Sequence, residues 1–334
     1  MPVWRSVLAG HRANETAEGS SRAWSDARGE GRGRRVRGEC AKKRLMGVRP
    51  VGWLSGVLVV ALCLAASGIH AQQAHADWPE AISDNSFFIE EAYNQDPGVV
   101  QFIFGGLYTR PDRFWTYTFT NEWPVPDIRN QLSYMVTYSG QGPDQPRGTG
   151  DTYLNYRFQA LLEEKDGVAF APRLSAIAPT GDWRKGLGYG VWGWQVALPF
   201  SKRVASHLAV HLDLGATYYP GAKALTDRGT LARADLAGTD EGTSLVWLIT
   251  PRFNLLLEAL ATQQQQFSDS GLVERVNQAL LSPGFRMAFN FRSGQLVVGA
   301  AAPFGLTPES QNSGAFLYLS WEAPVWKPRR ARAA

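Results

Sequence analysis

Cysteine is nearly absent from this chain, which contains two, Cys40 and Cys63. Both lie upstream of the signal-peptide cleavage positions that we expect from the sequence, so the exported chain contains none. This excludes a disulfide framework, a thiol-based catalytic site and a cysteine-ligated metal centre.

Long apolar runs are also scarce. After residue 71, no run reaches the roughly 20 residues that a transmembrane helix needs. A net excess of basic charge is likewise missing beyond residue 45. Residues 1–45 hold eleven Lys and Arg residues against five acids, so the remaining residues together carry −2 of the total net charge of +4. A nucleic-acid-binding protein needs a basic face on its folded domain, so we do not expect nucleic acid as a partner.

The N-terminal region reads as a leader followed by an export signal. Residues 1–45 are rich in Gly, Ser, Arg and Glu and cannot form a core, so they are either a disordered extension or untranslated sequence ahead of Met46. Residues 46–76 have the layout of a secretory signal: the positive charge of "KKRLMGVRP", the apolar run "WLSGVLVVALCLAA", and small residues that allow cleavage after Ala71 or Ala76.

The rest of the chain alternates polar and apolar residues with the period of a β-strand. In "GDTYLNYRFQAL" (150–161), one face carries Asn155 and Arg157, and the other carries Leu154, Tyr156 and Phe158. A soluble sandwich buries the apolar face, whereas a membrane barrel turns it toward lipid. Aromatic pairs at the ends of the apolar faces favour the barrel, because such rings prefer the headgroup level. These pairs include Tyr134 and Tyr138, Trp192 and Trp194, and Tyr218 and Tyr219.

Twelve segments are candidate strands: 98–108, 113–122, 130–139, 150–162, 168–179, 189–199, 204–218, 242–250, 253–263, 281–291, 294–303 and 314–322. From the third strand onward, tight joints alternate with long polar ones such as 219–241 and 264–280, for which we expect irregular loops. An even number of antiparallel strands with this alternation predicts an all-β fold, an antiparallel outer-membrane β-barrel of about twelve strands spanning 98–322. A basic tail, 323–334, follows it.

Residues 77–97 precede the first strand and are expected at the periplasmic end. Phe88, Ile89, Ala92 and Tyr93 have helix-like spacing, so the segment is predicted either to form a short helix that narrows the barrel or to be a disordered lead-in. In the first case, Phe88, Ile89 and Tyr93 are the gating residues.

Charged residues on the polar faces are expected to line the lumen. We predict that Arg157, Arg173, Arg286, Asp213 and Glu258 contact a solute, since guanidinium groups bind planar anions and charged rings set pore selectivity. The alternative is that charges of both signs pair across a narrow interior and fill it.

Four stretches resemble a known family: "FIEEAYNQDPGVVQ" (88–101), "GDTYLNYRFQAL" (150–161), "FAPRLSAIAPTGDWRKGLGYGVWGWQVALPFSK" (170–202) and "LDLGATYYPGA" (212–222). They are similar to the meta-pathway of phenol degradation family of bacterial outer-membrane β-barrels. The resemblance implies an outer-membrane location and uptake of small, aromatic or hydrophobic compounds, and it brings no catalytic residues with it.

The sequence therefore predicts a non-enzymatic outer-membrane channel for passive or facilitated uptake of small compounds, without a cofactor. Two alternatives remain: a lipid hydrolase, which needs a Ser/His pair on the lipid-facing surface, and a structural barrel with a plugged lumen. The expected partners are outer-membrane lipid, a small solute, and the barrel-insertion machinery, which recognises terminal strands such as "GAFLYLSW" (314–321). The sequence does not indicate an oligomeric state.

Overall fold

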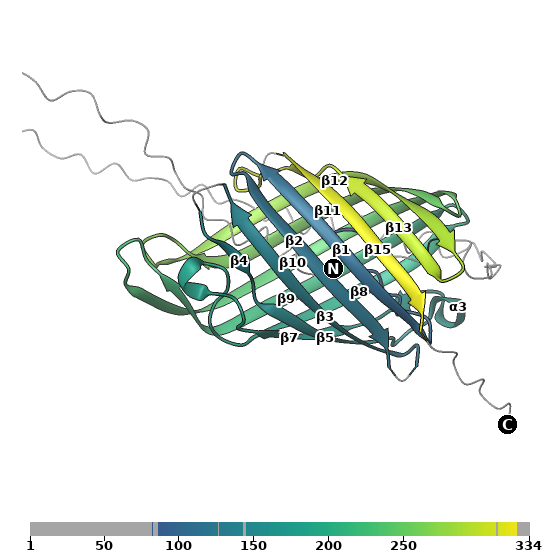
Figure 1. Cartoon of the computed structure of the whole chain (residues 1–334), viewed down its shortest axis with the longest axis horizontal. Coiled ribbons are helices and arrows are strands. Elements are labelled where there is room, and N and C mark those ends of the chain that lie inside the picture. The colour runs from purple at the N-terminus through teal and green to yellow at the C-terminus, as the bar shows by residue number, and fades with distance from the viewer. Residues whose placement is uncertain (1–81, 83–85, 126, 143–144, 312, 326–334) are drawn as a thin grey trace, which may run out of the picture.

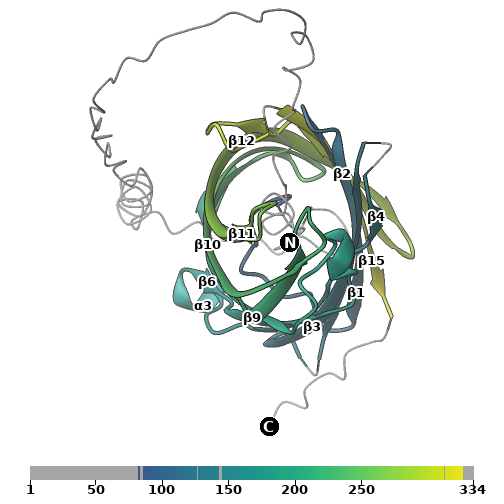
Figure 2. The ribbon, with the colours of Figure 1, turned by 90° about the vertical axis from the view of Figure 1, so that its left-hand side faces the viewer.

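The chain forms one closed antiparallel β-barrel. The structure, a computed structural model, describes residues 82, 86–125, 127–142, 145–311 and 313–325. Each barrel strand pairs with its neighbours along the chain, and β1 pairs with β15 to close the ring. Figure 1 shows the tilted strands from the side, and Figure 2 looks along the barrel into the ring. The predicted twelve-stranded barrel is confirmed.

The barrel strands are β1 (Val99–Arg110), β2 (Phe114–Pro124), β3 (Asn130–Gln141), β5 (Thr152–Phe158), β7 (Arg173–Ala178), β8 (Gly193–Ala205), β9 (Leu208–Leu225), β10 (Leu231–Thr250), β11 (Phe253–Phe267), β12 (Val273–Phe291), β13 (Gly294–Ala301) and β15 (Ser313–Pro324). Three short strands pair with barrel strands: β4 (Arg147–Thr149) with β3, β6 (Ala169–Phe170) with β8, and β14 (Phe304–Gly305) with β12 and β15. The helices α3 (Glu163–Asp166) and η1 (Trp183–Lys185) lie in connections. Among the described residues, no helix has the length and apolar character needed to cross a membrane.

The strands turn their apolar sides outward and their polar sides inward, as predicted. Phe285 and Phe289 are 43% and 42% exposed, whereas Arg157 and Arg286, on the other face of their strands, are each 3% exposed. This arrangement is the reverse of a soluble sandwich and matches a barrel whose outer band contacts lipid.

The two ends of the barrel differ. At the terminus end lie Val99 and Pro324, which are paired partners, together with tight turns such as Ser206–His207 and Pro251–Arg252. At the loop end lie the connections 179–192 and 302–312, among others. We use these two names for the ends below.

Two predicted loops are wrong, because β9 to β12 continue beyond the expected strand limits. Strand β10 begins at Leu231 and β12 at Val273, so 219–241 and 264–280 are mainly strand. Their outward residues are polar and bond across strands: the Tyr218 hydroxyl donates to Asp235 (2.7 Å) and the Gln263 amide donates to Asn277 (2.8 Å). Because both faces of these segments are polar, the sequence lacks the apolar alternation that predicts a strand.

Outward aromatic rings gather on neighbouring strands at similar heights. Trp194 pairs in register with Tyr218, and Tyr117 with Tyr138, and all four are more than one third exposed. Tyr219 was grouped with this set in the sequence, but it faces inward and is 7% exposed. Its ring lies in the lumen, because successive residues of a strand point to opposite faces.

Candidate functional site

The lumen contains the chain's own residues 86–98, which we call the lumen segment. Figure 2 shows the trace that precedes β1 lying inside the ring of strands. Phe87, Phe88, Ile89 and Ala92 are each 0% exposed. The segment consists of bends and turns with no helix, so the predicted short helix does not form here.

Side chains of the barrel wall replace the hydrogen bonds that a helix would make. Glu258 accepts the backbone N–H groups of Phe88 and Ile89 at 2.8 and 3.1 Å. Ser201 accepts the N–H of Ala92 at 2.7 Å. Further along, Gln159 and Gln131 accept the N–H groups of residues 94 and 95. Because buried N–H groups need partners, these wall side chains make an extended path through the lumen possible.

One side of the lumen segment is apolar. The ring of Phe87 lies 5.3 Å from that of Phe316, and the ring of Phe88 lies 5.0 Å from the same ring. Wall glycines leave space for this side. A Cβ atom at Gly299 would lie 2.5 Å from Phe87, and one at Gly242 would overlap the Cδ1 atom of Ile89.

The opposite side carries Glu90, which is 3% exposed. The Nε atom of Arg173 donates to both carboxylate oxygens at 2.8 and 2.9 Å, and Arg157 Nη1 lies 3.4 Å from Oε1. Arg157 also donates to the carbonyl oxygens of Glu91 and Tyr93 at 3.2 and 2.6 Å. Two guanidinium groups on neighbouring strands therefore share one carboxylate of the lumen segment.

The Glu90 pKa is lowered to about 2. Burial raises a carboxyl pKa, but the nearby positive charges, that of Arg173 first, outweigh it here. A carboxyl whose folded-state pKa is lowered contributes stability above its unfolded pKa of about 4.3 and loses it only as the pH falls toward 2. Mild acidification therefore leaves this contact intact.

Glu91 makes a second charged contact with the wall. Its Oε1 atom lies 3.6 Å from His211 Nε2 and 3.7 Å from Arg286 Nη1, and it accepts the Ser86 hydroxyl at 2.9 Å. The other ring nitrogen of His211 lies 2.7 Å from the Ser201 hydroxyl. The Ser201–His211 pair was missed in the sequence, because its members are ten residues apart and meet only through the register of β8 and β9.

Most of the sequence-predicted site residues contact the lumen segment. Arg157, Arg173, Arg286 and Glu258 bind its charges or its N–H groups, as described above. Asp213 also faces the lumen and is 1% exposed. Of the predicted gating residues, Phe88 and Ile89 pack against the wall, whereas the Tyr93 hydroxyl donates to Glu163 at 2.6 Å, near the terminus end. Their predicted roles in solute contact and gating stay predictions.

A second group of buried residues fills the loop-end half of the lumen. It is apolar and aromatic, and consists of Met135, Tyr153, Ile177, Tyr219, Leu236 and Phe267 with small alanines. Tyr189, from the 179–192 connection, packs its ring 4.5 Å from that of Tyr219. The lumen therefore has a charged compartment around Glu90 and an apolar compartment nearer the loop end.

Comparisons with known proteins agree with this fold. No family model and no curated protein matches the chain. Among solved structures, the COG4313 outer membrane channel from Pseudomonas putida F1 matches with a TM-score of 0.53 at 15% identity, over 70% of this chain and 97% of that chain. The NanC porin matches with a TM-score of 0.42 at 7% identity, over 66% and 98%. The CymD monoaromatic hydrocarbon channel matches with a TM-score of 0.32 at 10% identity, over 70% and 90%. At 15% identity, the likeness to the COG4313 channel concerns the barrel fold.

We predict that Gly242→Ala loosens the lumen segment, because the added methyl group overlaps Ile89. Overpacking of this kind costs about 1–3 kcal/mol. A cysteine introduced at Ala92 in the cysteine-free exported chain reports release through its rate of maleimide labelling. Gly242→Ala is expected to speed labelling several-fold, and adding Ile89→Ala is expected to reverse the effect. Gly106→Ala is the control, since its Cβ atom meets its nearest neighbour at an ordinary 3.4 Å. Equal labelling rates in all variants contradict the prediction.

We also predict that Glu90→Gln exposes the lumen segment to proteolysis. The change leaves Arg157 and Arg173 buried without their counterion, and breaking a buried pair costs about 3–5 kcal/mol. Limited proteolysis with mass analysis of the N-terminus measures the effect, and adding Arg173→Gln is expected to restore part of the protection. Lys185→Gln, which removes an exposed ion pair with Asp182, is expected to change little. Full protection in the Glu90→Gln protein shows that this ion pair does not hold the segment.

Proposed function

We propose that this protein is an outer-membrane channel for the passive or facilitated uptake of small, apolar or aromatic solutes. The lumen segment closes it at rest. The support is the combination of an outer-membrane-type barrel with a cluster of buried apolar and aromatic side chains in the loop-end half of its lumen. The resemblance of residues 88–101 and 170–202 to the phenol meta-pathway family supports the same solute class.

The observation that carries the proposal is how the lumen segment is attached. The backbone N–H groups of residues 88, 89, 92, 94 and 95 donate to wall side chains such as Glu258, Ser201 and Gln159. The ladder hydrogen bonds of the barrel join strand to strand. The segment can therefore leave the lumen without breaking the barrel, as a gate requires.

A hydrolase requires a nucleophile that lipid can reach. The Ser201–His211 pair faces the lumen, where its hydroxyl accepts the N–H of Ala92, and both side chains are at most 2% exposed. This placement gives the hydrolase alternative no support, and we propose that the protein is not an enzyme.

The proposed partners follow from the outer surface. The exposed apolar band, which includes Leu214, Phe285 and Leu317, is suited to outer-membrane lipid. The terminal strand β15 carries outward Leu317 and Leu319, and ends three residues after the aromatic Trp321. We propose that the barrel-insertion machinery recognises this strand.

Removal of residues 77–96 tests the closed-channel proposal. In planar bilayers, the refolded exported chain is expected to conduct rarely, and the deletion variant is expected to show sustained conductance, because Glu90 and the rings of Phe87 and Phe88 no longer fill the lumen. Retention of the barrel is checked by its β-type circular dichroism. A folded deletion variant without conductance favours a structural barrel with a plugged lumen.

A further inference from the structure

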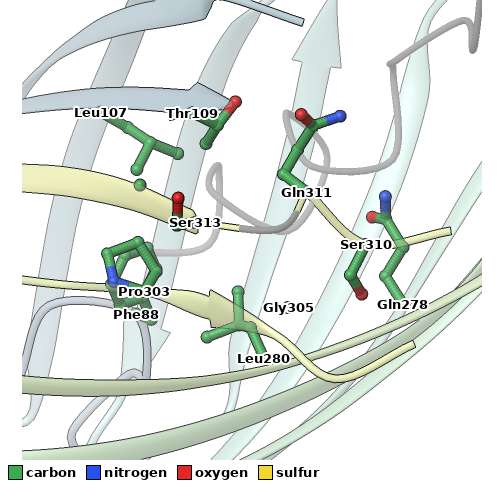
Figure 3. A pocket seen from close by; sticks show the side chains of 11 residues that line it. Phe88, Leu107, Thr109, Gln278, Leu280, Pro303, Gly305, Ser310, Gln311 and Ser313 are labelled. Carbon is green, nitrogen blue, oxygen red and sulfur yellow. The ribbon is translucent and has the colours of Figure 1, made fainter. Parts of the chain in front are cut away.

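A small pocket lies between the lumen segment and the loop end. Figure 3 shows Phe88 at one side, Leu107 and Thr109 from β1, Gln278 and Leu280 from β12, and residues of the 302–312 connection. Its cavity volume is about 20 Å³, which is enough for one water molecule and too small for an aromatic ring.

Three side-chain oxygens at this pocket are buried and have no hydrogen-bond partner within the described part of the chain. They are Thr109 Oγ1, Gln278 Oε1 and Gln311 Oε1. Thr109 is 2% exposed and Gln278 is 8% exposed. In Figure 3, the Thr109 hydroxyl and the Gln311 amide face each other across the pocket.

The two amides have a defined orientation. Gln278 Nε2 donates to the carbonyl oxygen of Glu309 at 2.8 Å, and Gln311 Nε2 donates to the Asp112 carboxylate at 2.7 Å. A carbonyl or carboxylate oxygen at neutral pH only accepts, so in each amide the nitrogen must face it. Both Oε1 atoms are therefore left as acceptors.

A buried acceptor without a hydrogen-bond partner raises the free energy of the protein. A ligand that donates a hydrogen bond to such an acceptor therefore gains affinity. The rest of the pocket is apolar, with Leu107, Leu280, Pro303 and the ring of Phe88. Its chemistry fits a molecule with a hydroxyl group on an apolar body.

We propose that this pocket is the recognition subsite for a hydroxyl-bearing, apolar solute, and that its occupation displaces Phe88. This proposal rests on the proposed channel function and specifies its solute. A ring enters only if Phe88 moves. Phe88 is part of the lumen segment, and its N–H is held by Glu258. Binding of the solute therefore disturbs the Phe88–Glu258 hydrogen bond, which helps to keep the segment docked.

Paired ligands that differ by one hydroxyl group test the subsite. Binding of benzyl alcohol and of toluene to the full exported chain is measured by titration calorimetry in one detergent. Benzyl alcohol is expected to bind more tightly. Thr109→Val is expected to weaken benzyl alcohol about two- to tenfold and to leave toluene unchanged, the effect of losing one hydrogen bond. Gln278→Met also removes the bond to the Glu309 carbonyl, so it is expected to weaken benzyl alcohol at least as much.

Thr120→Val is the matched control. Thr120 is also a buried lumen threonine, 6% exposed, and lies outside the pocket, so this change is expected to alter the binding of neither ligand. Thr109→Val keeps the shape of the side chain, so a fold defect is not expected to imitate the effect. A parent protein that does not distinguish the two ligands, or a Thr109→Val protein with an unchanged ratio, overturns the proposal.

The coupling to Phe88 has its own readout. Benzyl alcohol is expected to speed maleimide labelling of the Ala92→Cys protein, and Thr109→Val is expected to abolish this acceleration. Unchanged labelling at saturating ligand overturns the displacement step. The two proposals can fail separately. If the full exported chain distinguishes the two ligands but the variant lacking residues 77–96 does not conduct, the channel is contradicted and the subsite is kept. If the variant conducts but the full chain does not distinguish the ligands, the subsite is contradicted and the channel is kept.

Discussion

The docking of the lumen segment depends on one carboxylate placed between two guanidinium groups. Arg157 and Arg173 are register partners on β5 and β7, and both point into the lumen, where they repel each other unless an anion lies between them. Glu90 supplies that anion from the lumen segment. In an open lumen, water would solvate the same two cations. Docking of the lumen segment therefore replaces the hydration of two guanidinium groups by an ion pair with Glu90. A buried ion pair stabilises little beyond what hydration of its separate charges gives. A lumen segment held this way is fixed in position and, in the proposed channel, can still be released.

The two sides of the lumen segment are held by different interactions. On the apolar side, Ile89 and Phe87 pack into the space that Gly242 and Gly299 leave in the wall. Charge decides the other side, where Glu90 meets its arginines. The helix-like spacing in the sequence reflects this asymmetric surrounding. A helix would satisfy its own N–H groups and leave the Glu258 carboxylate unpaired in the wall, so the extended path is the better partner for this barrel.

Within the strands that the sequence showed, alternation predicted most of the residues that face the lumen, because a strand in a barrel has one side toward lipid and one toward the interior. Arg286 and Phe285 illustrate this, as neighbours on β12 that face inward and outward. Features that depend on pairing between distant strands were out of reach. Ser201 and His211 meet only because β8 and β9 pair in one register. The acceptors at the pocket depend on the hydrogen bonds that Gln278 and Gln311 make with Glu309 and Asp112, and a single sequence carries no signal of those contacts.

Phe88 belongs both to the docked lumen segment and to the pocket, and in the proposed channel this sets a size requirement for the solute. A ligand shifts an equilibrium only by its difference in affinity for the two states. A molecule small enough for the 20 Å³ cavity binds with Phe88 in place and opens nothing. A larger apolar body gains its contacts only after the ring leaves Phe316, so its binding energy favours the undocked segment. In the proposed mechanism, the hydroxyl group selects the ligand, and the contacts of its apolar part favour the undocked segment.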